Sequence, residues 1–210
     1  MKYHIILVTP FKQNCTLVWC EKTGDAVLID PGGEANVLSQ VVKKIGVAIT
    51  EIWLTHGHLD HVGAAIELAK FYDVPIIGPH PDDEPLLAKL PEQCQMFGLD
   101  TIITPFKPTR WLMNGCRLHL GCLSFYVLHC PGHSPGHVVF WNKSKKFIFM
   151  GDVLFNGSIG RTDLPGGDLD TLIKSIRNQL LLLSNDIVFL PGHGPKSTLG
   201  YERWNNPFLQ

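Results

Sequence analysis

The stretch Thr-His-Gly-His-Leu-Asp-His spans residues 55–61 of this 210-residue sequence. It holds three histidines and one aspartate within six positions. Gly57 separates the first two histidines, and glycine tolerates backbone angles that other residues avoid, so both imidazoles can converge. Imidazole nitrogen and carboxylate oxygen together favour zinc, iron or manganese over calcium or magnesium. The stretch therefore predicts a binding site for one of those metals.

The place of this stretch between a strand and a helix predicts a layered α/β protein. Residues 51–55 are predicted as a short strand that leads directly into the histidine cluster. Residues 62–72 are predicted as a helix, because apolar side chains from Ala65 to Tyr72 recur on one face. In α/β proteins the loops at the carboxyl ends of strands usually carry the active site.

Three other predicted strands end in the same way, with a glycine near a polar side chain that can bind a metal. One such ending alone would indicate only a turn, but four together predict a shared site. The strands at 123–130, 147–151 and 187–190 lead to His133, Asp152 and His193.

The candidate metal ligands are too many for one tetrahedral zinc ion, which takes four. They suit two divalent ions that share a carboxylate. Two metals about 3.5–4 Å apart can hold a bridging hydroxide and polarise the bond that it attacks. The candidates are His56, His58, Asp60, His61, His133, Asp152 and His193.

The remaining pattern predicts strands and helices in each half of the chain, hence two sheets with helices outside, in one domain over residues 1–210. Residues 80–110 are weakly periodic and predict a short helix at 84–89 followed by a long loop. The other predicted strands are 5–8, 15–20, 26–30, 75–78, 117–120 and 137–141, and the other predicted helices are 35–45 and 169–183.

Composition narrows the class of protein. Apolar residues make up 45% of the chain and charged residues 18%, as in ordinary globular proteins. A net charge of -1 argues against a general nucleic-acid binder. The apolar run near the N-terminus is too short for a signal peptide, and no segment approaches the roughly 20 residues of a membrane span. The six cysteines form no Cys-x-x-Cys pair, so we expect a cytoplasmic protein with free thiols.

The sequence resembles the metallo-β-lactamase superfamily, whose signature His-x-His-x-Asp-His stands at residues 56–61. Within it, the chain is similar to glyoxalase II, the hydroxyacylglutathione hydrolases, and to their compact bacterial type without the long C-terminal helical domain. The resemblance extends over segments 30–33, 54–63, 130–137, 151–152, 160–163 and 191–195.

This resemblance implies a four-layer αββα sandwich and two divalent metal ions, with zinc the first choice and iron or manganese the alternatives. It places His56, His58 and His133 on the first metal. It places Asp60, His61 and His193 on the second metal, with Asp152 as the bridge. Asp60 and Asp152 are thereby predicted to be catalytic as well as ligating.

The implied activity is hydrolysis of a small thioester such as S-D-lactoylglutathione to a hydroxy acid and glutathione, a step of methylglyoxal detoxification. No membrane or nucleic-acid partner is expected. A first alternative is a persulfide dioxygenase that holds one iron through His56, His133 and Asp152. A second is a non-catalytic metal-binding scaffold, although such a protein is expected to have lost ligands and none is missing here.

Four side chains near these motifs have more than one interpretation. Arg161 is a candidate to bind a substrate carboxylate, or equally a partner in a surface salt bridge. His137 is expected to pack or to orient a ligand rather than to bind metal. Asp30 can hydrogen-bond a ligand histidine or cap its own turn. Cys130 is expected to be a buried thiol and not a nucleophile.

Overall fold

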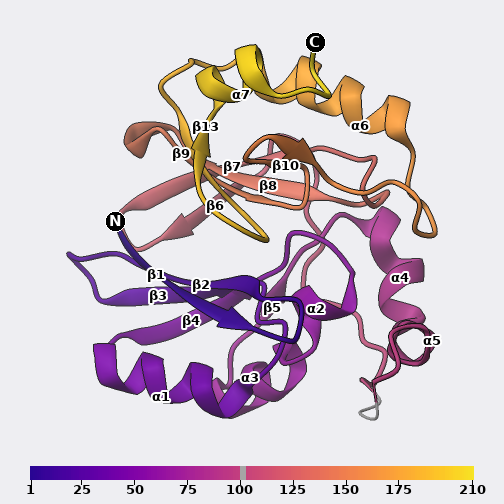
Figure 1. Cartoon of the computed structure of the whole chain (residues 1–210). Coiled ribbons are helices and arrows are strands. Elements are labelled where there is room, and N and C mark those ends of the chain that lie inside the picture. Colours follow the sequence, from indigo (N-terminus) through magenta and orange to yellow (C-terminus); the bar gives the residue numbers. More distant parts are fainter. Residues whose placement is uncertain (100–102) are drawn as a thin grey trace.

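Two β-sheets packed face to face form the centre of the computed structural model, which describes residues 1–99 and 103–210. Helices cover the outer side of each sheet, α1 and α3 on one and α6 and α7 on the other (Figure 1). The predicted four-layer αββα sandwich is confirmed. The single domain over 1–210 stays a prediction.

The first sheet has five strands in the order β1-β2-β3-β4-β5. The first three strands pair antiparallel, whereas β3, β4 and β5 run parallel. Every residue of β2 except Trp19 is buried, as expected for a strand that is covered on both faces. The strands are β1 (Lys2–Val8), β2 (Gln13–Trp19), β3 (Asp25–Ile29), β4 (Ala48–Trp53) and β5 (Ile76–Ile77).

The second sheet has six strands in the order β13-β12-β9-β8-β7-β6. Only β9 and β12 pair in parallel, and the other neighbours are antiparallel. The strands are β6 (Arg117–Leu120), β7 (Leu123–His129), β8 (Val138–Asn142), β9 (Phe147–Gly151), β12 (Val188–Pro191) and β13 (Ser197–Thr198). A separate hairpin joins β10 (Leu154–Phe155) to β11 (Ser158–Ile159).

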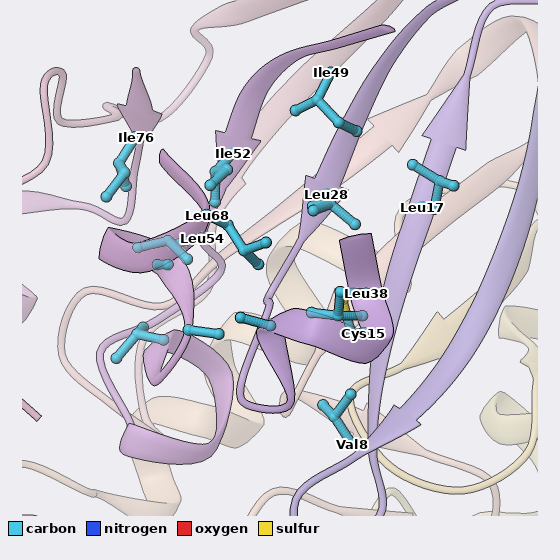
Figure 2. Packing of buried hydrophobic residues seen from close by; sticks show 14 of the residues in the cluster. Val8, Cys15, Leu17, Leu28, Leu38, Ile49, Ile52, Leu54, Leu68 and Ile76 are labelled. Carbon is cyan, nitrogen blue, oxygen red and sulfur yellow. The ribbon is translucent and has the colours of Figure 1, made fainter. Parts of the chain in front are cut away.

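The helices of the outer layers pack on the sheets through apolar side chains on one face. In the first half, α1 (Ala35–Ile45) buries Leu38 and α3 (Ala65–Tyr72) buries Leu68. Figure 2 shows both leucines among buried strand residues such as Leu28 of the first sheet. Each buried leucine contributes about 1.5–3 kcal/mol through removal of apolar surface from water.

The second half repeats this arrangement on the other sheet. The helix α6 (Leu169–Ser175) continues as a π-helical segment, η3 (Ile176–Leu180), and α7 (Leu199–Asn205) lies beside it (Figure 1). Between the two sheets, the Trp53 ring meets Phe125 at 5.1 Å and Phe140 at 5.3 Å. These aromatic contacts hold the two halves together.

Several predicted elements are wrong in detail. The helix predicted at 62–72 is two helices, α2 (Leu59–Val62) and α3, because the Ala64 N–H donates to the Pro31 carbonyl and not within a helix. The helix predicted at 169–183 ends at Leu180. The hairpin β10–β11, the strand β13 and the helix α7 were not predicted.

The loop predicted after residue 89 begins instead with a helix, α5 (Leu90–Met96). Proline is well accommodated in the first turn of a helix, so Pro91 lies in the first turn of α5 and does not mark a loop. The helix predicted at 84–89 is α4 (Glu84–Ala88), preceded by η1 (Pro81–Asp83); η2 (Lys143–Lys145) joins β8 to β9. The part of the predicted loop at 100–102 lies outside the described residues.

The topology brings four strand ends to one edge of the sandwich. The parallel strands β3 and β4 end on the same side, as do the parallel strands β9 and β12. The loops that follow them carry most of the polar side chains singled out in the sequence. Over residues 1–99 and 103–210, no helix has the length and apolar character needed to cross a membrane. The cytoplasmic location stays a prediction.

Candidate metal centre

The loop between β4 and α2 presents three buried histidines at the edge where the strands end. Residues 52–54, which lead from β4 into this loop, are fully buried in the core. His56 and His61 are fully buried and His58 is 8% exposed. An imidazole this deeply buried needs a partner for its nitrogen atoms.

Three imidazoles converge as a first group. His56, His58 and His133 each offer one nitrogen, and these atoms lie within 4.8 Å of one another. The His58 Nδ1 lies 2.9 Å from the His133 Nε2. Burial lowers the pKa of all three, in the case of His58 to about 3, so the rings are neutral at pH 7 and have lone pairs for a cation.

A carboxylate and two imidazoles form a second group. The ligand atoms of Asp60, His61 and His193 also lie within 4.8 Å of one another. The His193 Nε2 is 3.2 Å from the Asp60 Oδ2, and the His61 Nε2 is 3.7 Å from the same oxygen. Burial acts to lower the pKa of His61, but the charges of Asp152 and Asp60 outweigh it and raise that pKa well above its usual value.

Asp152 lies between the two groups. Its Oδ1 is 3.5 Å from the His61 Nε2, and its Oδ2 is 3.6 Å from the Nε2 atoms of both His133 and His193. These separations are too long for good hydrogen bonds. They match the about 3.4 Å expected between two ligands on one tetrahedral ion with bonds of about 2.1 Å.

Several ligand-type atoms in this cluster have no hydrogen-bond partner among residues 1–99 and 103–210. They include the Nε2 atoms of His56 and His61 and the Oδ1 of Asp152. An unsatisfied buried polar group costs about 1–3 kcal/mol. A cation in each group would satisfy these atoms together, so the donor set fits two divalent metal ions. Nitrogen and carboxylate donors suit zinc, iron and manganese.

Hydrogen bonds behind the cluster orient its imidazoles. The His61 Nδ1 lies 2.9 Å from the Asp30 Oδ2, and the Thr55 N–H donates to the other Asp30 oxygen at 2.7 Å. Asp30 therefore contacts a predicted ligand and also anchors the end of β4. The His133 Nδ1 donates to the Arg161 carbonyl at 2.8 Å, which turns its Nε2 toward Asp152.

His137 lies behind the cluster and not within either group. Its Nε2 accepts a hydrogen bond from the Asp152 N–H at 2.9 Å. Its ring also stacks on that of His56 with centroids 4.6 Å apart. Both contacts are those of a side chain that holds neighbouring ligands in place, as the sequence interpretation expected.

Asp83 is a supporting residue that sequence reasoning missed. Its carboxylate accepts hydrogen bonds from the Gly57 N–H at 2.8 Å, the Ser134 hydroxyl at 2.8 Å and the Gly136 N–H at 2.5 Å. It thereby ties together the two loops that carry the first group of imidazoles. Nothing in the sequence distinguishes it from Asp82, since both follow a proline at the start of a helix.

A close approach of two loops makes Gly192 necessary. A Cβ atom at this position would collide with the Asp152 Oδ1 and lie 2.6 Å from the His61 ring. The glycine after β12 therefore allows the backbone before His193 to pass directly beside the cluster.

A cavity of about 570 Å³ opens over the metal centre. One wall carries side chains of the cluster, including Asp60, Asp152 and His193. The apolar part of the wall consists of Phe11, Phe97, Phe155, Ile159, Leu164 and Pro195. The cavity can therefore hold a small organic molecule with its reactive group at the metal centre.

Arg161 lines the same cavity. Its guanidinium donates to both oxygens of Asp163, at 2.8 Å and 2.7 Å, so the salt bridge, one of its two predicted roles, is formed. The ion pair lies on the surface and is weak enough for a substrate carboxylate to compete with it. Cys130 is fully buried, does not line the cavity, and has its thiol pKa raised by burial.

Comparisons with known proteins show the family and the fold of this chain. A family model described as the metallo-beta-lactamase superfamily matches residues 8–193. The protein named hydroxyacylglutathione hydrolase GloC from Haemophilus influenzae is 49% identical over 210 residues, covering 100% of this chain and 98% of that protein.

Two solved structures share the whole fold. The BLEG-1 B3 metallo-beta-lactamase has a TM-score of 0.91 and 36% identity, with 99% of each chain covered. The protein TTHA1623, solved in a di-iron-bound form, has a TM-score of 0.89 and 42% identity, with 98% of this chain and 100% of that chain covered. The resemblance predicted from the sequence is confirmed.

Proposed function

The chain belongs to the metallo-β-lactamase superfamily, and from that premise we propose that it hydrolyses a small thioester such as S-D-lactoylglutathione. The products would be a hydroxy acid and glutathione. We further propose two divalent metal ions as cofactors, with zinc the first choice and iron or manganese the alternatives. The di-iron form of TTHA1623 keeps iron among the metals to test.

One observation carries the proposal. Two groups of three ligand atoms, each within 4.8 Å, lie on either side of Asp152 and face a cavity of about 570 Å³. We assign His56, His58 and His133 to one metal and Asp60, His61 and His193 to the other. Asp152 would bind both.

When bound, the metal pair would polarise the substrate carbonyl and supply an activated water at neutral pH. The protein's own residues prepare the site for this. The three imidazoles of the first group are kept neutral by burial, so their lone pairs are free at pH 7. Asp60 and Asp152 supply the negative charge that balances the cations, and both are held ionised by neighbouring histidines.

The leaving group explains why no strong acid is needed beside the metals. A thiol of the cysteine type has a pKa of about 8.5, so it leaves readily as the thiolate. Among the described residues that line the cavity there is no lysine, glutamate or cysteine, and its histidines and aspartates are all assigned to the metals, so no free group is left to protonate a leaving amine. This lining suits a thioester better than an amide, whose amine leaving group requires a proton.

The shape and polarity of the cavity support a small organic substrate. Its apolar wall would exclude water and hold carbon chains, while Arg161 provides the cation for a carboxylate of the thiol portion. The name of the Haemophilus influenzae relative supports glutathione as that thiol.

The test combines metal analysis with a turnover assay on the purified full-length protein. We expect about two metal ions per chain and hydrolysis of S-D-lactoylglutathione that chelation abolishes and metal restores. His119 is exposed and remote from the cluster, so His119→Ala serves as a matched control that keeps activity.

Three outcomes would contradict the proposal. Metal-replete protein without activity on lactoylglutathione would overturn the assignment of that substrate. A single iron with oxygen uptake on glutathione persulfide would indicate a dioxygenase. Full metal content without turnover of any thioester, lactam or phosphoester would indicate a metal-binding scaffold.

A further inference from the structure

Two cysteines from different sheets meet at the edge of the sandwich. The Sγ atoms of Cys20 and Cys122 lie 3.3 Å apart. Cys20 is buried, whereas Cys122 is exposed, and both are free thiols. Cys20 follows β2 in the first sheet, and Cys122 lies in the turn between β6 and β7 in the second. The pair is therefore a contact between sheets, 102 positions apart in the chain.

The two turns are shaped to approach each other. Leu120 pairs with Leu123, so Gly121 and Cys122 form a two-residue turn. Gly121 has a positive φ of 54°, and a Cβ atom there would collide with the Thr23 Oγ1 and lie 3.0 Å from the Cys20 Sγ. Only glycine allows this close packing, which brings the neighbouring thiol onto Cys20.

The surroundings of Cys20 favour its thiolate. Hydrogen bonds from the Cys122 backbone N–H and from Thr23 lower the pKa of Cys20 to about 6. A thiolate is the nucleophilic form of cysteine, so this sulfur is prepared for exchange near neutral pH. Burial raises the pKa of Cys15 and of Cys130, so those two thiols are inert by comparison.

The pair lies far from the metal centre. Gln13 begins β2 and lies 3.4 Å from the His61 Nδ1, whereas Cys20 follows the other end of that strand. Seven residues of extended strand separate them by about 20 Å. Figure 1 shows β1 starting at the end labelled N and β2 returning to that end. The pair therefore belongs to no part of the proposed catalytic site.

We propose that Cys20 and Cys122 form a reversible disulfide that links the two sheets, with a low-molecular-weight disulfide such as oxidised glutathione as the oxidant. Bond formation needs a movement of only about 1 Å from the present contact. Such bonds in cytosolic proteins are usually transient and respond to the redox state. The proposal does not depend on the proposed hydrolase function.

The exchange proceeds in two steps that balance. Exposed Cys122 loses its proton to water, and its thiolate attacks oxidised glutathione, which forms a mixed disulfide on Cys122 and releases one glutathione thiolate that takes up a proton. The Cys20 thiolate then attacks the Cys122 sulfur, which forms the protein disulfide and releases the second glutathione thiolate. One molecule of glutathione disulfide is reduced to two thiols, and two protein thiols are oxidised.

The test treats the full-length reduced protein with oxidised glutathione and follows its intact mass and free thiols. Wild type should lose two of its six thiols and two hydrogens, with Cys20 linked to Cys122 in a peptide map. Cys20→Ser should keep glutathione on Cys122, because the second thiol is missing. Cys122→Ser should not react under the same conditions, because Cys20 is buried. Cys116→Ser is the matched control and should behave as wild type.

A thermal melt gives a second readout. The oxidised wild type should unfold at a higher temperature than the reduced form, because the bond closes a long loop in the unfolded chain. Cys122→Ser, a change at an exposed position, should show no such shift. The proposal is overturned if wild type retains six thiols, or if it stops at a stable mixed disulfide on Cys122. A disulfide between any other two cysteines would overturn it equally.

Discussion

The His61 Nδ1 lies 2.9 Å from the Asp30 Oδ2 in a pair that is buried on both sides. This hydrogen bond holds the proton on Nδ1 and leaves Nε2 to face Asp60 and Asp152. Asp30 stands at the end of β3 and His61 in α2, so the pair links the parallel part of the first sheet to the proposed metal centre.

Asp30→Asn should weaken the metal site that contains His61 more than the other, because Asp30 contacts His61 directly and reaches His56 only through the Thr55 hydroxyl. Loss of a carboxylate behind a ligand histidine typically reduces metal affinity 10–100-fold. Competition with a chromophoric chelator measures the affinity of each site. Asp25→Asn, at the start of the same strand, is the matched control. Two unchanged affinities in a folded Asp30→Asn protein would show that the pair has no part in metal binding.

Asp152→Asn should have a larger effect, because this residue is assigned to both metals. We expect at most one tightly held ion and a fall in kcat of at least about 100-fold, or about 2.7 kcal/mol. Metal analysis and the lactoylglutathione assay check both effects on the same sample. A variant with two metals per chain and wild-type turnover would contradict the bridging role.

Asp83→Asn should destabilise the fold around the first group of imidazoles. The amide cannot accept all three hydrogen bonds from Gly57, Ser134 and Gly136, so at least one buried donor loses its partner. The free energy of unfolding should fall by about 1–3 kcal/mol, measured by urea denaturation. Asp82→Asn, at an exposed neighbour, should change it little. Equal stability of the two variants would refute this prediction.

Asp83 should also make the free energy of unfolding depend on pH, and the direction follows from its raised pKa. Burial raises its pKa to about 6, and the three donors offset this only in part. Between about pH 4 and 6 the folded chain therefore holds a proton that the unfolded chain has lost. The contribution of Asp83 to the free energy of unfolding therefore falls as pH rises through that window, by at most about 1.4 kcal/mol per pH unit.

The free energy of unfolding is measured against pH for wild type and for Asp83→Asn, both freed of metal with a chelator. The difference between the two curves gives the contribution of Asp83, because the histidines titrate in both proteins and cancel. The difference should slope downward between pH 4 and 6 and level off above pH 7. A flat difference, or one that rises with pH, would show that the pKa of Asp83 is not raised.

Arg161 and Asp163 should act in opposite directions on substrate binding. If the guanidinium binds a substrate carboxylate, Arg161→Gln should raise KM about tenfold with little change in kcat. Asp163→Asn should lower KM, because it frees the guanidinium from its ion pair. Steady-state kinetics on lactoylglutathione separate the two parameters. An unchanged KM in both variants would assign the pair to the surface alone.

The candidate ligands could be read from the sequence because each carries a local signal. His56, His58 and His61 crowd into one short loop, and Asp152 and His193 follow glycines at predicted strand ends. Alternating strand and helix patterns likewise predicted the two sheets with outer helices. Two errors have a clear physical cause: at Ala64 a tertiary contact replaces a helical hydrogen bond, and Pro91 lies in the first turn of a helix that was predicted as a loop. The shortest elements, the hairpin β10–β11 and the strand β13, and the helix α7 were not predicted.

Other features depend on contacts between distant parts of the chain and have no local signal. Asp83 accepts from Ser134, 51 positions away, and Asp30 reaches His61 across 31 positions. The contact between Cys20 and Cys122 exists only because the two sheets pack face to face. The spacing of residues along the chain thus determined which side chains are candidates to bind metal. The packing of the two sheets decided which buried groups hold those side chains in place, because a buried polar group is satisfied by whatever partner the tertiary fold brings near.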